Sequence, residues 1–247
     1  MSGERALKDV DIIVLAGGLG TRVSHILGDV PKLLAPIDGK PFLGHLLDWL
    51  VGFGATRVLL SLGVRSERVL EYLAGHGRAS MTLVPLVEPS PLGTAGAVRF
   101  ALPHATSDTV FILNGDTFLE ADLNRFVANH RQASSYLSLL CAEVPSVARF
   151  GSVEVVDGHI ARFIEKDGAA DHPGLISAGM YLFSRAAIDA LQRSNGASLE
   201  RDFLQILPAG SIRAEITHGR FIDIGTPQSL AEAPHLVPAM AQARNPQ

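Results

Sequence analysis

The sequence has a single cysteine, Cys141, which excludes an intrachain disulfide and a zinc site built from several cysteines. Because Cys141 lies inside the apolar run from Tyr136 to Val144, we expect a small core residue rather than a nucleophile. No apolar run approaches the ~20 residues of a membrane-spanning helix, and Met1 to Arg5 contain no apolar signal core. The formal net charge of −4 gives no overall attraction for nucleic acid. We therefore expect a cytoplasmic protein that binds neither nucleic acid nor a membrane.

Two common glycine-rich phosphate loops are missing as well. Gly18 and Gly20 are followed by Thr21-Arg22-Val23, so the third glycine of the dinucleotide pattern G-x-G-x-x-G is absent, which disfavours a nicotinamide-dependent oxidoreductase. The Gly-Lys-Ser/Thr ending of the Walker loop is absent too. The nine histidines stand singly, without the spacing of a metal site, and we interpret them as ordinary surface or hydrogen-bonded residues.

A different glycine-rich segment is present near the start of the chain. The aliphatic run Ile12 to Leu15 leads into Ala16-Gly17-Gly18-Leu19-Gly20-Thr21-Arg22. Glycines without side chains let backbone N–H groups close on an anion such as a nucleotide phosphate. Arg22 and Lys32 add positive charge beside that loop. The segment predicts an enzyme that handles a nucleoside triphosphate; the alternative is a strand-to-helix turn whose glycines serve geometry alone.

Length and periodicity indicate the fold class. A chain of 247 residues with 47% hydrophobic and 19% charged residues is a globular protein with a substantial core. Up to residue 131 apolar strands alternate with helices, which predicts a doubly wound, mostly parallel α/β sheet. After Tyr136 the pattern becomes richer in strands. We expect one domain over residues 1–247, with a nucleotide-binding half at about 10–135 and an inserted, β-rich substrate half at about 136–230.

The expected strands and helices follow from local hydrophobic periodicity and from the residues that begin or end such elements. The expected strands are 12–15, 57–61, 81–87, 109–113, a hairpin of 153–156 and 160–164 around Asp157-Gly158, 175–183 and 221–225. The expected helices are 42–50, 67–73 capped by Ser66, 94–102, 121–131, 186–191, 199–207 capped by Ser198, and one beginning at Thr226-Pro227. We expect the last dozen residues, a proline-containing stretch, to run irregularly over the surface.

Polar and glycine-rich segments follow several of these strands. The first strand ends at Gly17 to Arg22, the third at Glu88 to Gly96, the fourth at Asn114-Gly115-Asp116, and a late strand contains Asp223. Since ligands bind beyond the carboxyl ends of the strands in doubly wound sheets, we expect these segments to meet in one crevice.

Six segments of the sequence resemble, in this order, the motifs of the sugar-phosphate nucleotidyltransferases. They are Leu15-Ala16-Gly17-Gly18-x-Gly20-Thr21-Arg22, Pro31-Lys32, Leu92-Gly93-Thr94-Ala95, Asn114-Gly115-Asp116, Glu165-Lys166 and Asp223-x-Gly225-Thr226. The resemblance covers about Asp11 to Leu230. It implies a Rossmann-like, GT-A-like fold with a β-rich sugar-binding region. It also implies a reaction in which a sugar 1-phosphate attacks the α-phosphorus of a nucleoside triphosphate and pyrophosphate leaves.

The resemblance also implies roles for individual residues, which we carry over motif by motif. It assigns catalysis to Arg22, Lys32 and Asp116, and the binding of a Mg²⁺ cofactor to Asp116 and Asp223. It assigns nucleotide binding to Leu15, Ala16, Gly17, Gly18, Gly20, Thr21, Arg22, Glu88, Gly93, Thr94 and Asn114. Of these segments, Glu88 and the Leu92-Gly93-Thr94 turn would lie beside the base. It assigns sugar-phosphate binding to Gly115, Gly151, Glu165, Lys166, Ser177 and Gly179. Two departures from the family pattern are Leu33, where many relatives have proline, and Ser177, where asparagine is common.

Within the family the sequence is most similar to the D-glycero-α-D-manno-heptose 1-phosphate guanylyltransferases, which implies GTP and the heptose 1-phosphate as substrates. The product would be GDP-heptose for a bacterial surface polysaccharide or glycoprotein. Alternatives within the family are a mannose-1-phosphate guanylyltransferase or a thymidylyl-, cytidylyl- or uridylyltransferase. A non-catalytic nucleotide-sugar sensor and a homo-oligomer also stay open. The presence of Arg22, Lys32, Asp116 and Asp223 favours an enzyme over a sensor.

Overall fold

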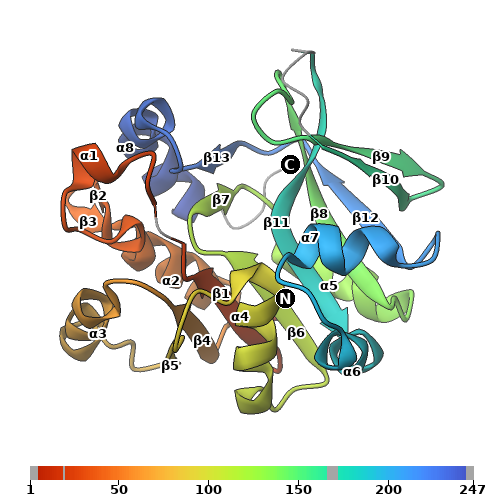
Figure 1. Ribbon diagram of the computed structural model, residues 1–247, viewed down its shortest axis with the longest axis horizontal. Helices are drawn as coiled ribbons and strands as arrows, with labels where there is room; N and C mark the ends of the chain where they lie inside the picture. The colour runs from red at the N-terminus through yellow and green to blue at the C-terminus, as the bar shows by residue number, and fades with distance from the viewer. Residues whose placement is uncertain (1–4, 19, 166–171, 243–247) are drawn as a thin grey trace.

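The computed structural model describes residues 5–18, 20–165 and 172–242. Its centre is a nine-stranded sheet with the order β5-β4-β1-β6-β11-β8-β12-β10-β9 (Figure 1). The first half of the sheet is parallel and consists of β1 (Asp11–Ala16), β4 (Arg57–Leu62), β5 (Thr82–Val87) and β6 (Thr109–Asn114). The three inner strands, β1, β4 and β6, are aliphatic runs buried on both faces, as parallel strands require. This half of the sheet confirms the strands expected from the sequence.

The second half of the sheet is mixed. Strand β11 (Gly174–Ser184) runs antiparallel to both β6 and β8 (Leu137–Val144), and β12 (Ile212–Thr217) pairs parallel with β8. The hairpin of β9 (Ser152–Val156) and β10 (His159–Ile164) completes the edge. Asp157 and Gly158 both have positive φ, 49° and 74°, the conformation that a two-residue hairpin turn needs. The predicted hairpin is therefore confirmed.

Alternate residues of the sheet face two separate hydrophobic clusters. Ile12 and Val14 pack in the cluster that contains α2 (Phe42–Gly52), α5 (Leu123–Gln132) and α8 (Pro227–Gln242). Ile13 packs in the other, with α4 (Gly93–Ala101) and α6 (Arg185–Arg193). Figure 1 shows the sheet between these two layers of helices. The remaining helices are α3 (Ser66–Gly75) and the short pieces α1 (Ser24–Leu27), α7 (Leu199–Asp202), η1 (Lys32–Leu34), η2 (Leu102–His104) and η3 (Leu204–Ile206).

Two small two-stranded sheets lie beside the central one. One pairs β2 (Pro36–Ile37) with β3 (Lys40–Pro41). The other pairs β7 (Thr117–Leu119) with β13 (Phe221–Asp223) in antiparallel register, Thr117 opposite Asp223. The N–H of Ile224 also donates to the carbonyl of Asp116 at 2.9 Å. This pairing brings Asp116 and Asp223 together although more than a hundred residues separate them in the chain.

The end of the described chain differs from the prediction. Helix α8 continues to Gln242 and contains Pro234 and Pro238, where we expected an irregular surface stretch. Each proline removes one backbone donor from the helix. The helix persists because Ala233, Val237 and Met240 are fully buried against the core. Here tertiary packing outweighs the local preference of proline.

Two other predicted boundaries were wrong, whereas the caps predicted at Ser198 and Thr226 are both present. The expected helix 199–207 consists of the short helix α7 followed by the turn η3. Ser66 is the first residue of α3 rather than its cap, because Arg65 precedes it in the left-handed region. At the start of α8, the Thr226 hydroxyl accepts from the Ser229 N–H at 3.2 Å, as a helix cap does.

A further sequence expectation concerns the burial of the single cysteine. Cys141 has no exposed surface, and burial raises the pKa of its thiol to about 12, so it is a core residue as predicted. Over residues 5–18, 20–165 and 172–242, no helix combines the length and the apolar character needed to cross a membrane.

A buried histidine makes stability depend on pH. His130 of α5 is 3% exposed, and its Nδ1 lies 2.8 Å from the hydroxyl of Ser138 on β8. Burial, and secondly the charge of Arg131, lower the pKa of His130 from 6.5 to about 4. Between these pH values the unfolded chain binds a proton that the fold excludes, so stability is lost as the pH falls. The difference corresponds to about 3 kcal/mol.

We therefore expect the free energy of unfolding, measured with urea between pH 7 and pH 4, to fall less in His130→Asn than in the unsubstituted protein. Asparagine can still hydrogen-bond to Ser138 but takes up no proton in this range. Replacing the exposed His25 by asparagine is the matched control and should leave the pH dependence unchanged. Equal pH dependence in His130→Asn and the unsubstituted protein would contradict this account.

Candidate active site

The carboxyl ends of β1 and β6 open into a large pocket. Its volume is about 640 Å³, and the glycine-rich segment after β1 forms one side of it. Many residues predicted for the site line it: Leu15, Ala16, Gly17, Gly18, Gly20, Thr21, Lys32, Glu88, Gly93, Thr94, Asn114, Gly115 and Asp116. We call this the larger pocket. The predicted convergence of strand ends is present in the fold.

Different physical reasons explain why glycine occupies each of the positions in this segment. A Cβ on Gly17 would lie 2.6 Å from the Glu88 carboxylate, so glycine is needed for packing there. Gly20 has a φ of +59°, which favours glycine. Gly18 is exposed, and a Cβ on it would meet nothing within 4 Å. Since neither packing nor a positive φ explains Gly18, its bare backbone is the one most available to a ligand.

Glu88 directly follows β5 and places a buried carboxylate in the larger pocket. It is 9% exposed, its Oε1 accepts from the Ser61 hydroxyl at 2.9 Å, and its Oε2 accepts from the Leu92 N–H at 3.2 Å. A carboxylate offers about four acceptor positions, so these two bonds hold it in place and leave acceptor capacity for a ligand.

A second, smaller pocket of about 210 Å³ adjoins the first. The residues around it are Arg22, Asn114, Asp116, Thr117, Arg149, Phe150, Ser177, Ala178, Gly179, Glu200, Phe221 and Asp223. We call it the smaller pocket. Asn114 and Asp116 line both pockets and form their common wall. The site is therefore one crevice with two compartments.

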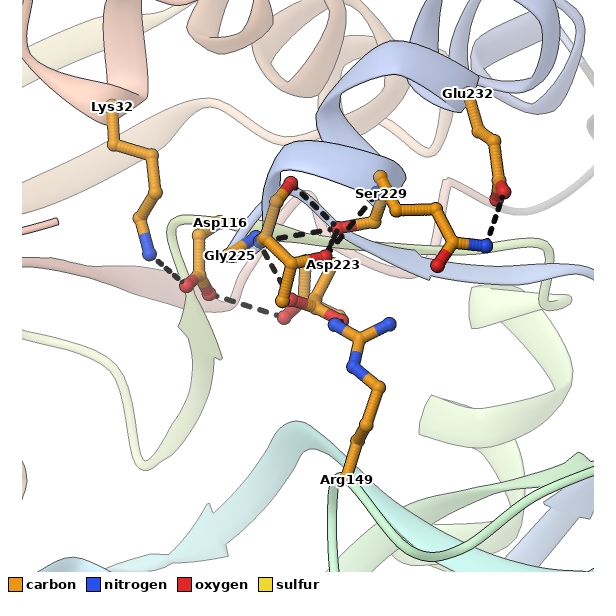
Figure 2. A network of polar contacts seen from close by, with 10 residues as sticks. Lys32, Asp116, Arg149, Asp223, Gly225, Ser229 and Glu232 are labelled. Atoms are coloured by element: carbon orange, nitrogen blue, oxygen red, sulfur yellow. Dashed lines mark hydrogen bonds and ion pairs between the residues drawn. The ribbon is translucent and has the colours of Figure 1, made fainter. Parts of the chain in front are cut away.

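Charged groups of both signs gather at this common wall (Figure 2). Lys32 Nζ bonds to Asp116 Oδ2, and Arg149 Nη2 lies 2.8 Å from Asp223 Oδ2. The Asp223 Oδ1 accepts from the Gly225 N–H at 2.8 Å, which fixes the carboxylate on its turn. The Arg22 guanidinium also approaches this turn, 3.6 Å from where a Cβ on Gly225 would stand. Arg22, Lys32, Asp116 and Asp223 thus surround one region, the arrangement that the sequence predicted.

Some predicted sugar-phosphate residues lie elsewhere or have another role. Gly115 lines the larger pocket rather than the smaller one, and a Cβ on it would lie 2.8 Å from the Leu15 carbonyl. Gly151 and the exposed Glu165 line neither pocket. Lys166 lies outside the described residues.

Ser177 and Gly179 do line the smaller pocket. Gly179 has a φ of +67°, and a Cβ on it would stand 2.1 Å from the Asn114 Nδ2. Glycine at 179 therefore makes room for the Asn114 side chain at the common wall.

Sequence reasoning missed three charged residues at the site. Arg149 and Glu200 line the smaller pocket, and Arg65 lines the larger one. Arg65 has a φ of 66° and donates to the Gly28 carbonyl at 2.8 Å; a non-glycine residue in this region is uncommon and tends to occur at functional sites. No local pattern distinguishes Arg149 or Glu200 from solvated surface charges, because their partners come from distant strands.

The comparison with known families agrees with this geometry. A family model described as nucleotidyl transferase matches residues 11–239. The chain belongs to this family. The resemblance drawn from the motifs is therefore confirmed, and the protein is a sugar-1-phosphate nucleotidyltransferase.

The individual relatives show which members of the nucleotidyl transferase family are similar. The D-glycero-α-D-manno-heptose 1-phosphate guanylyltransferase of Aneurinibacillus thermoaerophilus is 32% identical over 91% of this chain and 96% of its own length. The mannose-1-phosphate guanylyltransferase of Mycobacterium tuberculosis is 31% identical over 90% of this chain, but only 63% of its own length is covered. The structure of HddC from Yersinia pseudotuberculosis complexed with GMP-PN has a TM-score of 0.81 and 31% identity, covering 92% of this chain and 98% of the other.

Proposed function

We propose that this nucleotidyltransferase transfers the guanylyl group of GTP to D-glycero-α-D-manno-heptose 1-phosphate, giving GDP-heptose and pyrophosphate. The observation that carries the proposal is the two-compartment crevice with Asn114 and Asp116 in its common wall. One substrate in each pocket would place the two phosphate groups at that wall. The similarity in both length and sequence to heptose 1-phosphate guanylyltransferases supports the choice of substrates.

The reaction needs positioning and charge neutralisation more than covalent chemistry. An oxygen of the sugar phosphate attacks the α-phosphorus of GTP. As that bond forms, the bond from the α-phosphorus to the oxygen bridging to the β-phosphate breaks, and pyrophosphate leaves with the electron pair. Lys32 and Arg22, at the common wall and its neighbouring turn, supply fixed positive charge to the phosphates that meet there.

Asp116 and Asp223 fit the requirements of a Mg²⁺ site. Mg²⁺ is held in such enzymes by one or two carboxylates together with phosphate oxygens and water. Asp116 directly precedes β7 and Asp223 ends β13, so the pairing of these strands brings the two carboxylates together at the wall where the phosphates would meet. In the described part of the chain, no group of three or more His, Cys, Asp or Glu residues could hold a metal without phosphate. A bound Mg²⁺ would neutralise charge on the triphosphate.

Glu88 supports GTP among the nucleoside triphosphates. The Watson–Crick edge of guanine carries two neighbouring donors, N1–H and N2–H, whereas uracil and thymine present one donor between two acceptors. A carboxylate is acceptor-only and therefore matches guanine. Ser61 and Leu92 hold the Glu88 carboxylate inside the larger pocket, where a base would be read.

The direct test is pyrophosphate release with each nucleoside triphosphate and a panel of sugar 1-phosphates. We expect the highest kcat/KM with GTP and the heptose 1-phosphate, and a lower value with mannose 1-phosphate. Faster turnover with dTTP, CTP or UTP would overturn the choice of base, and faster turnover with mannose 1-phosphate the choice of sugar. Nucleotide binding without pyrophosphate release from any pair would instead indicate a sensor.

A further inference from the structure

A carboxylate that the motifs do not include faces the smaller pocket. Glu200 is an exposed residue in the short helix α7, and it lines the smaller pocket together with Asn114, Ser177 and Gly179. The Ser198 hydroxyl caps this helix by accepting from the Arg201 N–H at 3.2 Å. Glu200 therefore stands on an ordered turn at the edge of the compartment.

A buried tyrosine holds this carboxylate in place. Tyr181 of β11 is 2% exposed, and its hydroxyl donates to Glu200 Oε1 at 2.7 Å. The Ser177 hydroxyl lies 3.2 Å from the same tyrosine oxygen. Burial first, and then the negative charge of Glu200, raise the pKa of Tyr181 well above its usual value, so the tyrosine keeps its proton and remains a donor to Glu200.

The strand that carries Tyr181 is irregular at this point. Ser177 pairs with Cys141 of β8 and Tyr181 pairs with Leu139, so the register shifts between the two. Bulges of this kind are common beside active sites, where they redirect side chains. Here Ser177, Gly179 and Tyr181 are all within the irregular segment, and the first two line the smaller pocket.

Helix α7 is also tied to the larger pocket. The Leu199 N–H donates to the Thr94 hydroxyl at 2.8 Å, and the Ala95 N–H donates to the Ala197 carbonyl at 2.8 Å. A Cβ on Gly93 would lie 2.5 Å from that same carbonyl, so the contact between the two segments is close. Glu200 is thereby held at a defined position relative to the turn that lines the nucleotide compartment.

We propose that Glu200 is a specificity-determining residue that accepts hydrogen bonds from sugar hydroxyl groups in the smaller pocket, and that Tyr181 is the residue that positions it. The proposal rests on the proposed function in taking the smaller pocket as the sugar compartment, but it does not depend on which sugar binds. One bond from Tyr181 uses only part of the acceptor capacity of a carboxylate. A site built to bond a hydroxyl rejects the analogue that lacks it, because its polar group is then left unpaired.

The test compares Glu200→Gln and Tyr181→Phe with the unsubstituted enzyme. The substrates are the heptose 1-phosphate, mannose 1-phosphate and monodeoxy analogues of whichever of these is turned over faster. For Glu200→Gln we expect kcat/KM for the sugar phosphate to fall about 10- to 100-fold, the range for a hydrogen bond to a charged group, while the KM for GTP stays within about twofold. At least one deoxy analogue should lose much less than the parent sugar phosphate, so that discrimination against it collapses.

Tyr181→Phe keeps the buried ring and removes only the hydroxyl. We expect a fall of about 3- to 10-fold in kcat/KM for the sugar phosphate, with weakened discrimination against the same deoxy analogue. A merely structural role for Tyr181 would lower stability without changing that discrimination. Glu232→Gln, an exposed substitution on α8, is the matched control and should change neither value.

The outcomes separate this inference from the proposed function. If another sugar 1-phosphate is preferred but Glu200→Gln still loses discrimination on it, the inference stands and the choice of heptose fails. If the heptose 1-phosphate is the best substrate and Glu200→Gln retains full kcat/KM and full discrimination, the inference fails alone. If no pair is turned over, calorimetric binding of mannose 1-phosphate and of the heptose 1-phosphate takes the place of kcat/KM. Equal affinities in Glu200→Gln and the unsubstituted protein would then overturn the inference.

Discussion

Replacing Asp116 by asparagine is expected to lower kcat about 10³-fold. The substitution keeps the size of the side chain but removes its charge at the wall that both pockets share. A metal ion contributes several kcal/mol of transition-state charge stabilisation in reactions of this kind, and about 4 kcal/mol corresponds to 10³ in rate. The measurement is pyrophosphate release at saturating GTP and sugar 1-phosphate.

Asp223→Asn should show a loss of similar size, because the β7–β13 pairing puts the second carboxylate beside the first. In both variants we expect activity to need a higher Mg²⁺ concentration, which a purely structural defect would not cause. The control is Asp108→Asn: Asp108 is exposed and pairs with Arg185 on the surface, outside both pockets. Activity near the unsubstituted rate in either active-site variant would remove that aspartate from the metal site.

Replacing Glu88 by glutamine is expected to lower the preference for GTP over UTP about 100-fold. Glutamine has the same shape but presents an NH₂ donor where the carboxylate presented an acceptor. Against guanine that donor meets another donor, whereas against uracil it can meet an acceptor. A bidentate contact to a base contributes about 1–3 kcal/mol of discrimination, which corresponds to about 5- to 150-fold. In Glu88→Gln one base loses a contact while the other gains one, so we expect a change in the upper part of this range.

The measurement for Glu88→Gln is the ratio of kcat/KM for GTP to that for UTP, with one sugar 1-phosphate at a fixed concentration. Glu154→Gln serves as the matched control, since Glu154 lies on β9 at the opposite edge of the sheet from β5. An unchanged ratio in Glu88→Gln would mean that Glu88 only packs against Gly17 and Ser61. Base selection would then have to come from another part of the larger pocket.

The parallel half of the fold could be predicted from sequence because its signals are local. Aliphatic runs such as Ile12 to Leu15 end at glycine-rich turns, and a strand buried on both faces needs little else. Helix α8 could not be predicted in this way. Pro234 and Pro238 disfavour a helix locally, and only the burial of Ala233, Val237 and Met240 against distant elements explains it. The short strand β7 was missed for the same reason, since its partner β13 is far away in the chain.

In the active site, too, residues with local sequence signals could be predicted, and residues defined by distant partners could not. Asp116 and Asp223 were recognisable because each follows or interrupts an apolar strand within a known motif. Arg149 and Glu200 were not, because what distinguishes them is a partner elsewhere: Asp223 for Arg149 and Tyr181 for Glu200. Conversely, Gly151 and Glu165 fitted the motif pattern, yet neither lines a pocket in the described structure. Their predicted sugar contacts remain predictions.

The central claim is that one crevice holds both substrates, with their phosphates meeting at Asn114 and Asp116. A crystal structure with Mg²⁺, a non-hydrolysable GTP analogue and the sugar 1-phosphate tests it most directly. The account predicts the base beside Glu88 in the larger pocket, the sugar beside Glu200 in the smaller one, and the metal between Asp116 and Asp223. A nucleotide bound outside the larger pocket, or a metal held without either aspartate, would contradict it.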